Sequence, residues 1–284
     1  HGLYAGGDPR FKLSPEVEEK RIGSKQYPLI SGSGPVRGLT FVHAALSVEA
    51  MLTGNPYPLK ALYCAGGNPM VNQQNVKRVG EALRKLDLLV VADFFMTPTA
   101  ELADYVLPVT HWLERDETCD VMYLNTVAAR QKAIEPLFEC WDDMKIAIEL
   151  VKRLPWADRR FLPWNDTDEF NDFRIRGTGL SFEAFKKQGY VTVPRKYKKH
   201  EQSGFKTPTG KVELYSTVFE KLGYDPLPSF TEPPQSPTST PELLKDYPLI
   251  LITGGRHLGY FHSEGRQIPS LRKLVPDPQI LIHP

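Results

Sequence analysis

Residues 59–93 read LKALYCAGGNPMVNQQNVKRVGEALRKLDLLVVAD, and this stretch decides the fold class. The apolar run Leu59–Cys64 predicts a strand. The Asn-Pro pair at 68–69 predicts the start of a helix, because Asn suits the cap and Pro the first helical position. Apolar residues at three-to-four spacing continue this helix to about Lys85. The uninterrupted run Leu88–Ala92 is typical of a strand buried on both faces, so the stretch predicts a strand–helix–strand unit with parallel strands.

The flanking sequence extends this unit in both directions. Upstream, a Ser-Pro pair predicts a helix over residues 14–21, and spaced apolar residues predict another over 39–52. Downstream, the sequence predicts a short helix from Thr97 to Asp104 and a third strand at Tyr105–Val109. A further helix opens at Asp142-Asp143 and is expected to turn four apolar residues inward: Ile146, Leu150, Val151 and Leu154.

Composition shifts divide the rest of the chain. Residues 1–154 predict a partial α/β domain in which helices flank a parallel sheet, and residues 155–245 predict a Pro-rich connecting lobe. Within the lobe we expect a helix over 181–188 and a strand over 211–215. Residues 246–284 predict the beginning of a β-rich C-terminal domain, with strands over 247–253 and 279–283. The predicted fold class is therefore α/β.

Charge and cysteine usage exclude several classes of function. The 284 residues carry a net charge of +1, so no global field attracts nucleic acid or an anionic membrane. No apolar run reaches the ~18 residues of a membrane span. Cys64, Cys119 and Cys140 are far apart and not in CxxC spacing, which argues against a disulfide framework, a zinc site or an iron–sulfur site in this chain.

The candidate site lies where the predicted parallel strands end. The turn Gly66-Gly67-Asn68-Pro69 and the acidic residue Asp93 follow neighbouring strands, and ligands of such sheets bind at their carboxyl ends. The glycines permit close approach of a ligand, and the helix start offers unpaired N–H groups to an anion. The residues alone leave another interpretation open, in which Asn68 only caps the helix and Asp93 only ends a strand.

Two further places carry polar residues. Asp143, at a helix start, suits either capping or ligand binding. The turn after residues 247–253 gathers residues that favour a phosphate or a polar heterocycle over a metal. They are Arg256, His257, Tyr260, His262 and Ser263.

Several spaced motifs then occur in a recognisable order: AGGNP, LDLLVVADFFMTPTAELADYVLPVTHWLE, WDDMKIAIELVKRL, FKTPTGKVELYS and YPLILITGGRHLGYFHSEGRQIPSLR. This order resembles the dimethyl sulfoxide reductase superfamily of molybdopterin oxidoreductases over nearly the whole chain. The residue patterns of the later motifs are similar to those of the thiosulfate and polysulfide reductase branch and of the acetylene hydratase branch.

The resemblance implies a molybdenum or tungsten cofactor bound through molybdopterin guanine dinucleotide. Three groups of residues would then contact it. Gly66, Gly67, Asn68, Pro69, Asn72 and Asp143 would hold the guanosine end, Asp93 and Thr97 would lie beside it, and Arg256, His257, Tyr260, His262 and Ser263 would contact the pterin. No residue of this chain matches the family's metal ligand, so we expect no catalytic residue here.

The resemblance also implies a longer parent protein. Family members are about twice as long or more and begin with a cysteine cluster for an iron–sulfur centre, so we expect this chain to be an interior-to-C-terminal piece that is inactive alone. The parent would act on a small-molecule substrate and exchange electrons with a partner subunit or iron–sulfur protein. Relatives occur both in the cytoplasm and exported in folded form, so the compartment is not fixed. Three alternatives remain: an acetylene hydratase-like non-redox enzyme, a non-catalytic structural relative, and an unrelated nucleotide-binding module.

Overall fold

The protein is represented by a computed structural model, which describes residues 14–29, 31, 42–121, 125–252, 254, 257–260, 265–277 and 279–282. The chain forms two compact units, His1–Lys199 and His200–Pro284. This division differs from the boundary predicted at residue 154, because strand β6 (Tyr190–Thr192) pairs with a strand of the first unit. No helix among the described residues combines the length and the apolar composition needed to cross a membrane.

The first unit contains the predicted parallel sheet. Its strands are β1 (Ala61–Ala65), β2 (Leu88–Asp93) and β3 (Tyr105–Pro108), in the order β1-β2-β3. Both pairings are parallel, with Cys64 opposite Val91. An isolated parallel bridge from Val109 to Trp141 continues the sheet beyond β3. The predicted α/β class with a parallel sheet is therefore confirmed.

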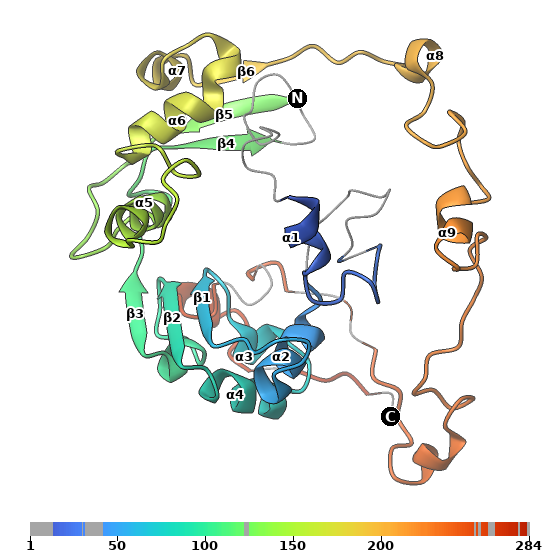
Figure 1. Ribbon diagram of the computed structural model, residues 1–284. Helices are drawn as coiled ribbons and strands as arrows, with labels where there is room; N and C mark the ends of the chain where they lie inside the picture. Colours follow the sequence, from blue (N-terminus) through green and yellow to red (C-terminus); the bar gives the residue numbers. More distant parts are fainter. Residues whose placement is uncertain are drawn as a thin grey trace. The chain divides into compact units, whose positions relative to one another are not determined.

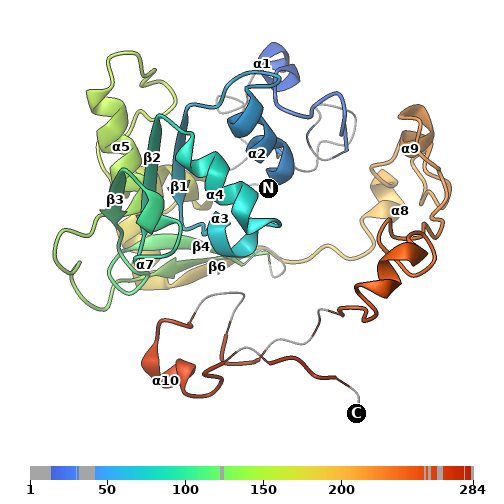
Figure 2. The same cartoon turned by 90° about the horizontal axis from the view of Figure 1, so that it is seen from below.

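Helices cover both faces of this sheet (Figure 2). On one face, Leu89 and Val91 of β2 share a core with Val79 and Leu83. On the other face, Ala92 packs in a cluster that includes Ile146. The alternation follows from the two-residue period of a strand. The helices concerned are α2 (Ala44–Thr53) and α4 (Val76–Arg84) on the first face and α5 (Asp143–Arg153) on the second.

The helix predicted from residue 69 to 85 is broken in two. α3 (Pro69–Asn72) ends after one turn, and α4 begins at Val76. Between them, Asn75 takes a left-handed conformation with φ 56°, which Asn tolerates better than most residues. Its Oδ1 accepts from the Arg78 N–H at 3.3 Å and caps α4. The Asn75 side chain explains both the break after α3 and the cap of α4, because a short polar side chain can bond to backbone groups that would otherwise continue the helix.

A second, antiparallel sheet completes the first unit and was missed from sequence. Its strands are β4 (Glu117–Val121), β5 (Thr126–Arg130) and β6, in the order β4-β5-β6. α6 (Thr167–Ile175) and α7 (Phe182–Gln188) pack against it (Figure 1). The core contains Val127, Ile175, Phe182 and Phe185, each no more than 4% exposed. α7 confirms the helix predicted over residues 181–188, whereas the three strands lay outside the prediction.

The prediction for α5 was right in its start and wrong in one inward residue. The helix begins at Asp143 and buries Ile146, but Leu150 is 42% exposed. Ile148 is buried in its place. The remaining short helices are α1 (Pro15–Glu19), α8 (His200–Ser203), α9 (Thr217–Lys221) and α10 (Pro269–Arg272), with 3-10 turns at Ala100–Leu102, Arg176–Thr178 and Pro241–Lys245.

The second unit contains no strand among its described residues. The strands predicted over 211–215, 247–253 and 279–283 are therefore wrong for the part of each that the structure describes. Leu251 and Ile252 are 77% and 87% exposed. A single apolar run has a strand's composition, but it needs a paired neighbour for its backbone hydrogen bonds, and no described segment pairs with these runs.

Candidate functional site

The turn after β1 leaves backbone open to a ligand. Gly66 has φ +59°, a left-handed conformation that favours glycine, and a Cβ atom there would meet no heavy atom within 4 Å. Its N–H donates to the Ala92 carbonyl oxygen at 3.0 Å and ties the turn to β2. Gly67 is packed more tightly, because a Cβ there would lie 3.1 Å from the Cys64 Sγ. The space for close approach is therefore at Gly66.

The N–H groups at the start of α3 are already used. Pro69 has no N–H, and the Met70 N–H donates to the Thr99 hydroxyl at 3.1 Å. The N–H groups of residues 71 and 72 donate to the Asn68 carbonyl oxygen at 2.9 and 3.0 Å. The prediction that this helix tip offers unpaired donors to an anion is therefore wrong.

Asn68 precedes α3 but does not cap it with its side chain. Its Oδ1 instead accepts from the Thr99 hydroxyl at 2.7 Å. The backbone N–H groups of Gly67 and Asn68 donate to no acceptor among the described residues. Two consecutive N–H groups in a turn commonly contact an anion. The available donors therefore lie in the turn before α3 and not in the helix itself.

Asp93 is the last residue of β2, and one oxygen of its carboxylate already accepts hydrogen bonds from the chain. Its Oδ1 accepts from the N–H groups of Phe94 at 2.7 Å and Phe95 at 3.4 Å. This local turn is the structural role that the sequence left open. No donor among the described residues contacts the second oxygen, so Asp93 keeps an acceptor for a ligand.

Two other residues that were predicted to contact the cofactor form hydrogen bonds within the chain. Thr97 is 6% exposed, and its Oγ1 accepts from the Ala100 N–H at 3.2 Å. Asn72 is exposed, and its Oδ1 accepts from the Gln73 side-chain amide at 3.2 Å. The hydrogen bond of Thr97 stabilises the 3-10 turn that follows it. A cofactor contact at either residue stays a prediction.

Asp143 is available because its neighbour caps α5. Asp142 is the cap residue, and its Oδ1 accepts from the N–H groups of Met144 at 2.8 Å and Lys145 at 3.2 Å. The side chain of Asp143 is 46% exposed, with Oδ2 3.4 Å from an Arg115 nitrogen. Burial raises the pKa of Asp143 above its ordinary value, and the charge of Arg115 opposes that rise. The carboxylate is thus held by one cation yet open on another side.

The charges of Asp143 and Asp93 each raise the pKa of a residue in β1. Burial raises the pKa of the Tyr63 hydroxyl, and the charge of Asp143 raises it further. The pKa of the Cys64 thiol is raised by burial, lowered by a backbone interaction with Gly67, and raised again by the charge of Asp93. Each acid therefore acts on a residue just before the glycine turn. A shared site for the turn, Asp93 and Asp143 stays a prediction.

No pattern in the sequence identifies Arg115 as a site residue. Its side chain is 19% exposed and contacts three carboxylates, those of Glu117 at 3.2 Å, Asp142 at 3.5 Å and Asp143 at 3.4 Å. It also donates to the Thr110 carbonyl oxygen at 2.7 Å. In the sequence, Arg115 is one member of a mixed charge run, and nothing in that run distinguishes it from a solvated residue.

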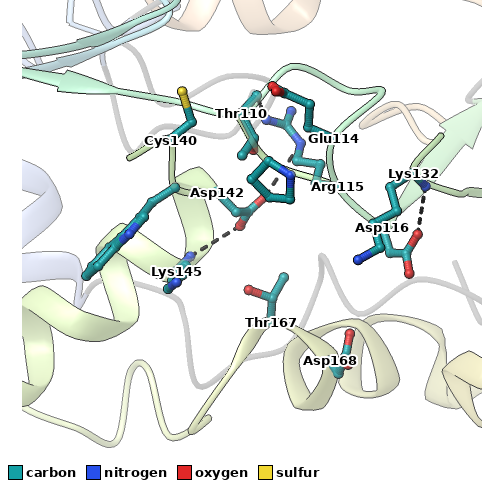
Figure 3. A pocket seen from close by; sticks show the side chains of 12 residues that line it. Thr110, Glu114, Arg115, Asp116, Lys132, Cys140, Asp142, Lys145, Thr167 and Asp168 are labelled. Atoms are coloured by element: carbon teal, nitrogen blue, oxygen red, sulfur yellow. Dashed lines mark hydrogen bonds and ion pairs between the residues drawn. The ribbon is translucent and has the colours of Figure 1, made fainter. Parts of the chain in front are cut away.

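Arg115 and Asp142 also line a polar pocket of about 220 Å³, between the N-terminal ends of α5 and α6. Figure 3 shows their side chains next to each other at its wall. Asp143 does not line this pocket, so the pocket is distinct from the β1 turn. No group of three His, Cys, Asp or Glu side chains among the described residues could hold a metal, and the three cysteines are free thiols.

The predicted pterin contacts lie in the second unit. Arg256, His262 and Ser263 fall outside the described residues. The Tyr260 hydroxyl donates to the Val275 carbonyl oxygen at 2.8 Å, and His257 Nδ1 accepts from the Gly259 N–H at 3.1 Å. These are contacts within one loop, and the pterin role stays a prediction.

Comparisons with known proteins concern the family and the fold. The family model described as molybdopterin oxidoreductase matches residues 15–153. Acetylene hydratase of Syntrophotalea acetylenica is 39% identical over 96% of this chain, and the molybdopterin-containing subunit of thiosulfate reductase from Salmonella typhimurium is 28% identical over 96%. A solved structure of acetylene hydratase from Pelobacter acetylenicus matches with a TM-score of 0.77 and 37% identity over 92% of this chain. The matches span 40%, 38% and 36% of those three proteins, so this chain is much shorter than each.

Proposed function

The chain belongs to the dimethyl sulfoxide reductase superfamily of molybdopterin oxidoreductases, on its acetylene hydratase-like branch, and on this premise we propose that it binds the guanosine diphosphate end of a molybdopterin guanine dinucleotide. The family implies a molybdopterin that carries molybdenum or tungsten, and its members similar to this chain are enzymes. The observation that carries the proposal is Asp143, a half-exposed carboxylate that pairs with Arg115 and whose charge acts on Tyr63 in β1, the strand before the glycine turn.

The free polar groups at this edge complement the proposed ligand. The turn offers donors, the N–H groups of Gly67 and Asn68, which suit the acceptor oxygens of a phosphate. Asp93 and Asp143 offer acceptors, which suit ribose hydroxyls and the N–H groups of a guanine edge. Gly66 leaves room for the ligand to approach the backbone. A guanosine diphosphate unit has acceptors at one end and donors at the other, as this edge requires.

The bound cofactor would supply the two-electron or atom-transfer chemistry of the parent enzyme. This chain's residues would bind and orient it: the turn at Gly67 and Asn68 would hold phosphate, and Asp143 would hold the base. Arg256, His257, Tyr260, His262 and Ser263 would contact the pterin. We extend the proposal to an iron–sulfur cluster elsewhere in the parent, a small-molecule substrate, and an electron-transfer subunit as partner.

The similarity to acetylene hydratase favours a second candidate. In that case the parent would hydrate a small unsaturated substrate such as acetylene, with no net electron transfer to a partner. The same guanosine contacts would serve both reactions, because the cofactor is held in the same way. Incubation of the full-length protein with acetylene separates the two: a hydratase converts it without a continuing supply of electrons, and a reductase or oxidase does not.

The binding role is tested by titrating the chain with GDP and ADP in a calorimeter. We expect a preference for GDP that is lost in Asp143→Asn, because a hydrogen bond to a charged group contributes about 1.5–3 kcal/mol, or about 10- to 150-fold in affinity. Asp158→Asn, at a partly exposed acid that forms an ion pair with Arg160 two residues on, is the matched control and should bind GDP normally. Unchanged GDP affinity in Asp143→Asn would contradict the proposal, as would absence of GDP binding by the unaltered chain.

A further inference from the structure

Thr99 lies beneath the glycine turn and is fully buried. It stands just before the 3-10 turn Ala100–Leu102, 31 residues after Asn68 in the sequence. Its hydroxyl oxygen accepts from the Met70 N–H at 3.1 Å and donates to the Asn68 Oδ1 at 2.7 Å. One buried hydroxyl therefore joins the backbone of α3 to the side chain of Asn68.

The hydroxyl also fixes which end of the Asn68 amide faces outward. A Thr hydroxyl has one hydrogen, and burial makes an unpaired donor costly. If the amide were reversed, the Thr99 oxygen would accept from both the Met70 N–H and the Asn68 NH2, and its own hydrogen would point at no acceptor. With Oδ1 toward Thr99, each of the three groups is satisfied. The two N–H bonds of the Asn68 NH2 are then left for a ligand.

We propose that Thr99 is a positioning residue: it holds the Asn68 side chain so that the NH2 group, and not the carbonyl oxygen, faces the bound nucleotide. The inference rests on the proposed function and refines it, because the ligand atom opposite Asn68 must be a hydrogen-bond acceptor. Together with the free N–H groups of Gly67 and Asn68, this NH2 group gives the turn a cluster of donors. Such a set recognises phosphate oxygens and rejects a donor-rich group at the same place.

The orientation is measurable without any ligand. In amide NMR spectra of the full chain, the Asn68 NH2 signals are identified by their absence in Asn68→Asp. We expect both protons to exchange with water as fast as those of an exposed Asn, because neither is bonded to the protein. One protected proton would show that the NH2 group donates to Thr99 and would overturn the inference, whatever GDP does.

Binding of GDP supplies the second readout. Addition of GDP should shift both Asn68 NH2 signals in the unaltered chain. Thr99→Ser keeps the hydroxyl and should bind GDP within about twofold of the unaltered chain, whereas Thr99→Val should bind about fivefold more weakly, the equivalent of one neutral hydrogen bond. Thr118→Val, a buried threonine in β4 with no hydroxyl partner among the described residues, is the matched control and should bind normally.

Failure of the positioning role and failure of the proposed function would give different results. Loss of GDP binding in every protein, with freely exchanging Asn68 protons, would overturn the proposed function and leave the orientation established. GDP binding that is equal in Thr99→Val and Thr99→Ser would overturn the positioning role and leave the proposed function standing. Tryptophan fluorescence checks that each variant is folded, since Trp112, Trp141, Trp156 and Trp164 all belong to the first unit.

Discussion

Replacing Arg115 with methionine should destabilise the first unit more than any other single charge removal near the site. The guanidinium is 19% exposed and faces Asp142 and Glu117, whose side chains are 16% and 21% exposed. Removing one partner of a buried ion pair costs about 3–5 kcal/mol, because the remaining charge stays desolvated. Glu117 keeps Arg130 at 2.5 Å and Asp142 keeps the N–H groups of α5, so we expect the low end, about 3 kcal/mol.

The loss should depend on pH in a fixed direction. Burial already raises the pKa of Asp143, and Arg115 is the cation that opposes this, so Arg115→Met raises that pKa further. A carboxyl group whose pKa is higher in the folded than in the unfolded state binds protons preferentially when folded. The destabilisation is therefore largest at neutral pH and diminishes as the pH falls through the raised pKa.

Urea unfolding followed by tryptophan fluorescence measures this loss at pH 7 and pH 5. The matched control is Arg160→Met, because the Arg160 side chain is 88% exposed and its ion pair with Asp158 should contribute less than about 1 kcal/mol. Equal losses in the two variants, or a loss in Arg115→Met that does not shrink at pH 5, would refute the reasoning.

Two further predictions concern the second sheet. Phe185→Ala removes a fully buried ring and should cost about 3–5 kcal/mol in urea unfolding, whereas Phe138→Ala, at a ring that is 98% exposed, should be close to neutral. Burial raises the pKa of Asp116, but hydrogen bonds from Lys186 and the Lys132 N–H bring it below its ordinary value. Lys186→Met should therefore lower stability at neutral pH by about 1–2 kcal/mol and much less at pH 3, while the exposed Lys187→Met should not; a pH-independent loss would contradict this.

The parts of the fold that were predicted correctly depend on neighbouring residues. The run Leu88–Ala92 contains no polar residue, and it forms the central strand β2. Ser14 and Ser181 each cap the helix that follows them, with the hydroxyl accepting from an N–H three residues on. Such signals lie within a few residues of each other, so they can be recognised without knowing the rest of the fold.

The second sheet could not be predicted because its pairing is distant and its strands are atypical. β6 has only three residues, and Val191 lies opposite Val127, far away in the sequence. β4 reads Glu-Thr-Cys-Asp-Val, which lacks the apolar alternation of a half-buried strand. Conversely, the apolar runs of the second unit have strand composition without a described partner. Composition selects candidates for strands, whereas pairing decides which of them form.

The sequence predicts a site at the glycine turn, but it does not point to the residues that bond to the predicted site residues. Thr99 acts on Asn68 across 31 residues, and Arg115 acts on Asp143 across 28. Neither separation is a helical or strand period, so no local pattern could join the pairs. The sequence therefore predicts groups that could contact a ligand, and the structure adds the distant side chains that bond to them.

The pair Asp142-Asp143 shows why adjacent residues of the same type still require coordinates. A helix start needs one acceptor outside its first turn, and the extended backbone of Asp142, with ψ 140°, places its carboxylate over the N–H groups of residues 144 and 145. Asp143 is the first helical residue, and its carboxylate lies beside Arg115. A start one residue later would exchange the two roles and turn the available carboxylate into the cap. Which of the two carboxylates is available therefore depends on where α5 begins, directly after the cap residue that follows the bridge from Val109 to Trp141.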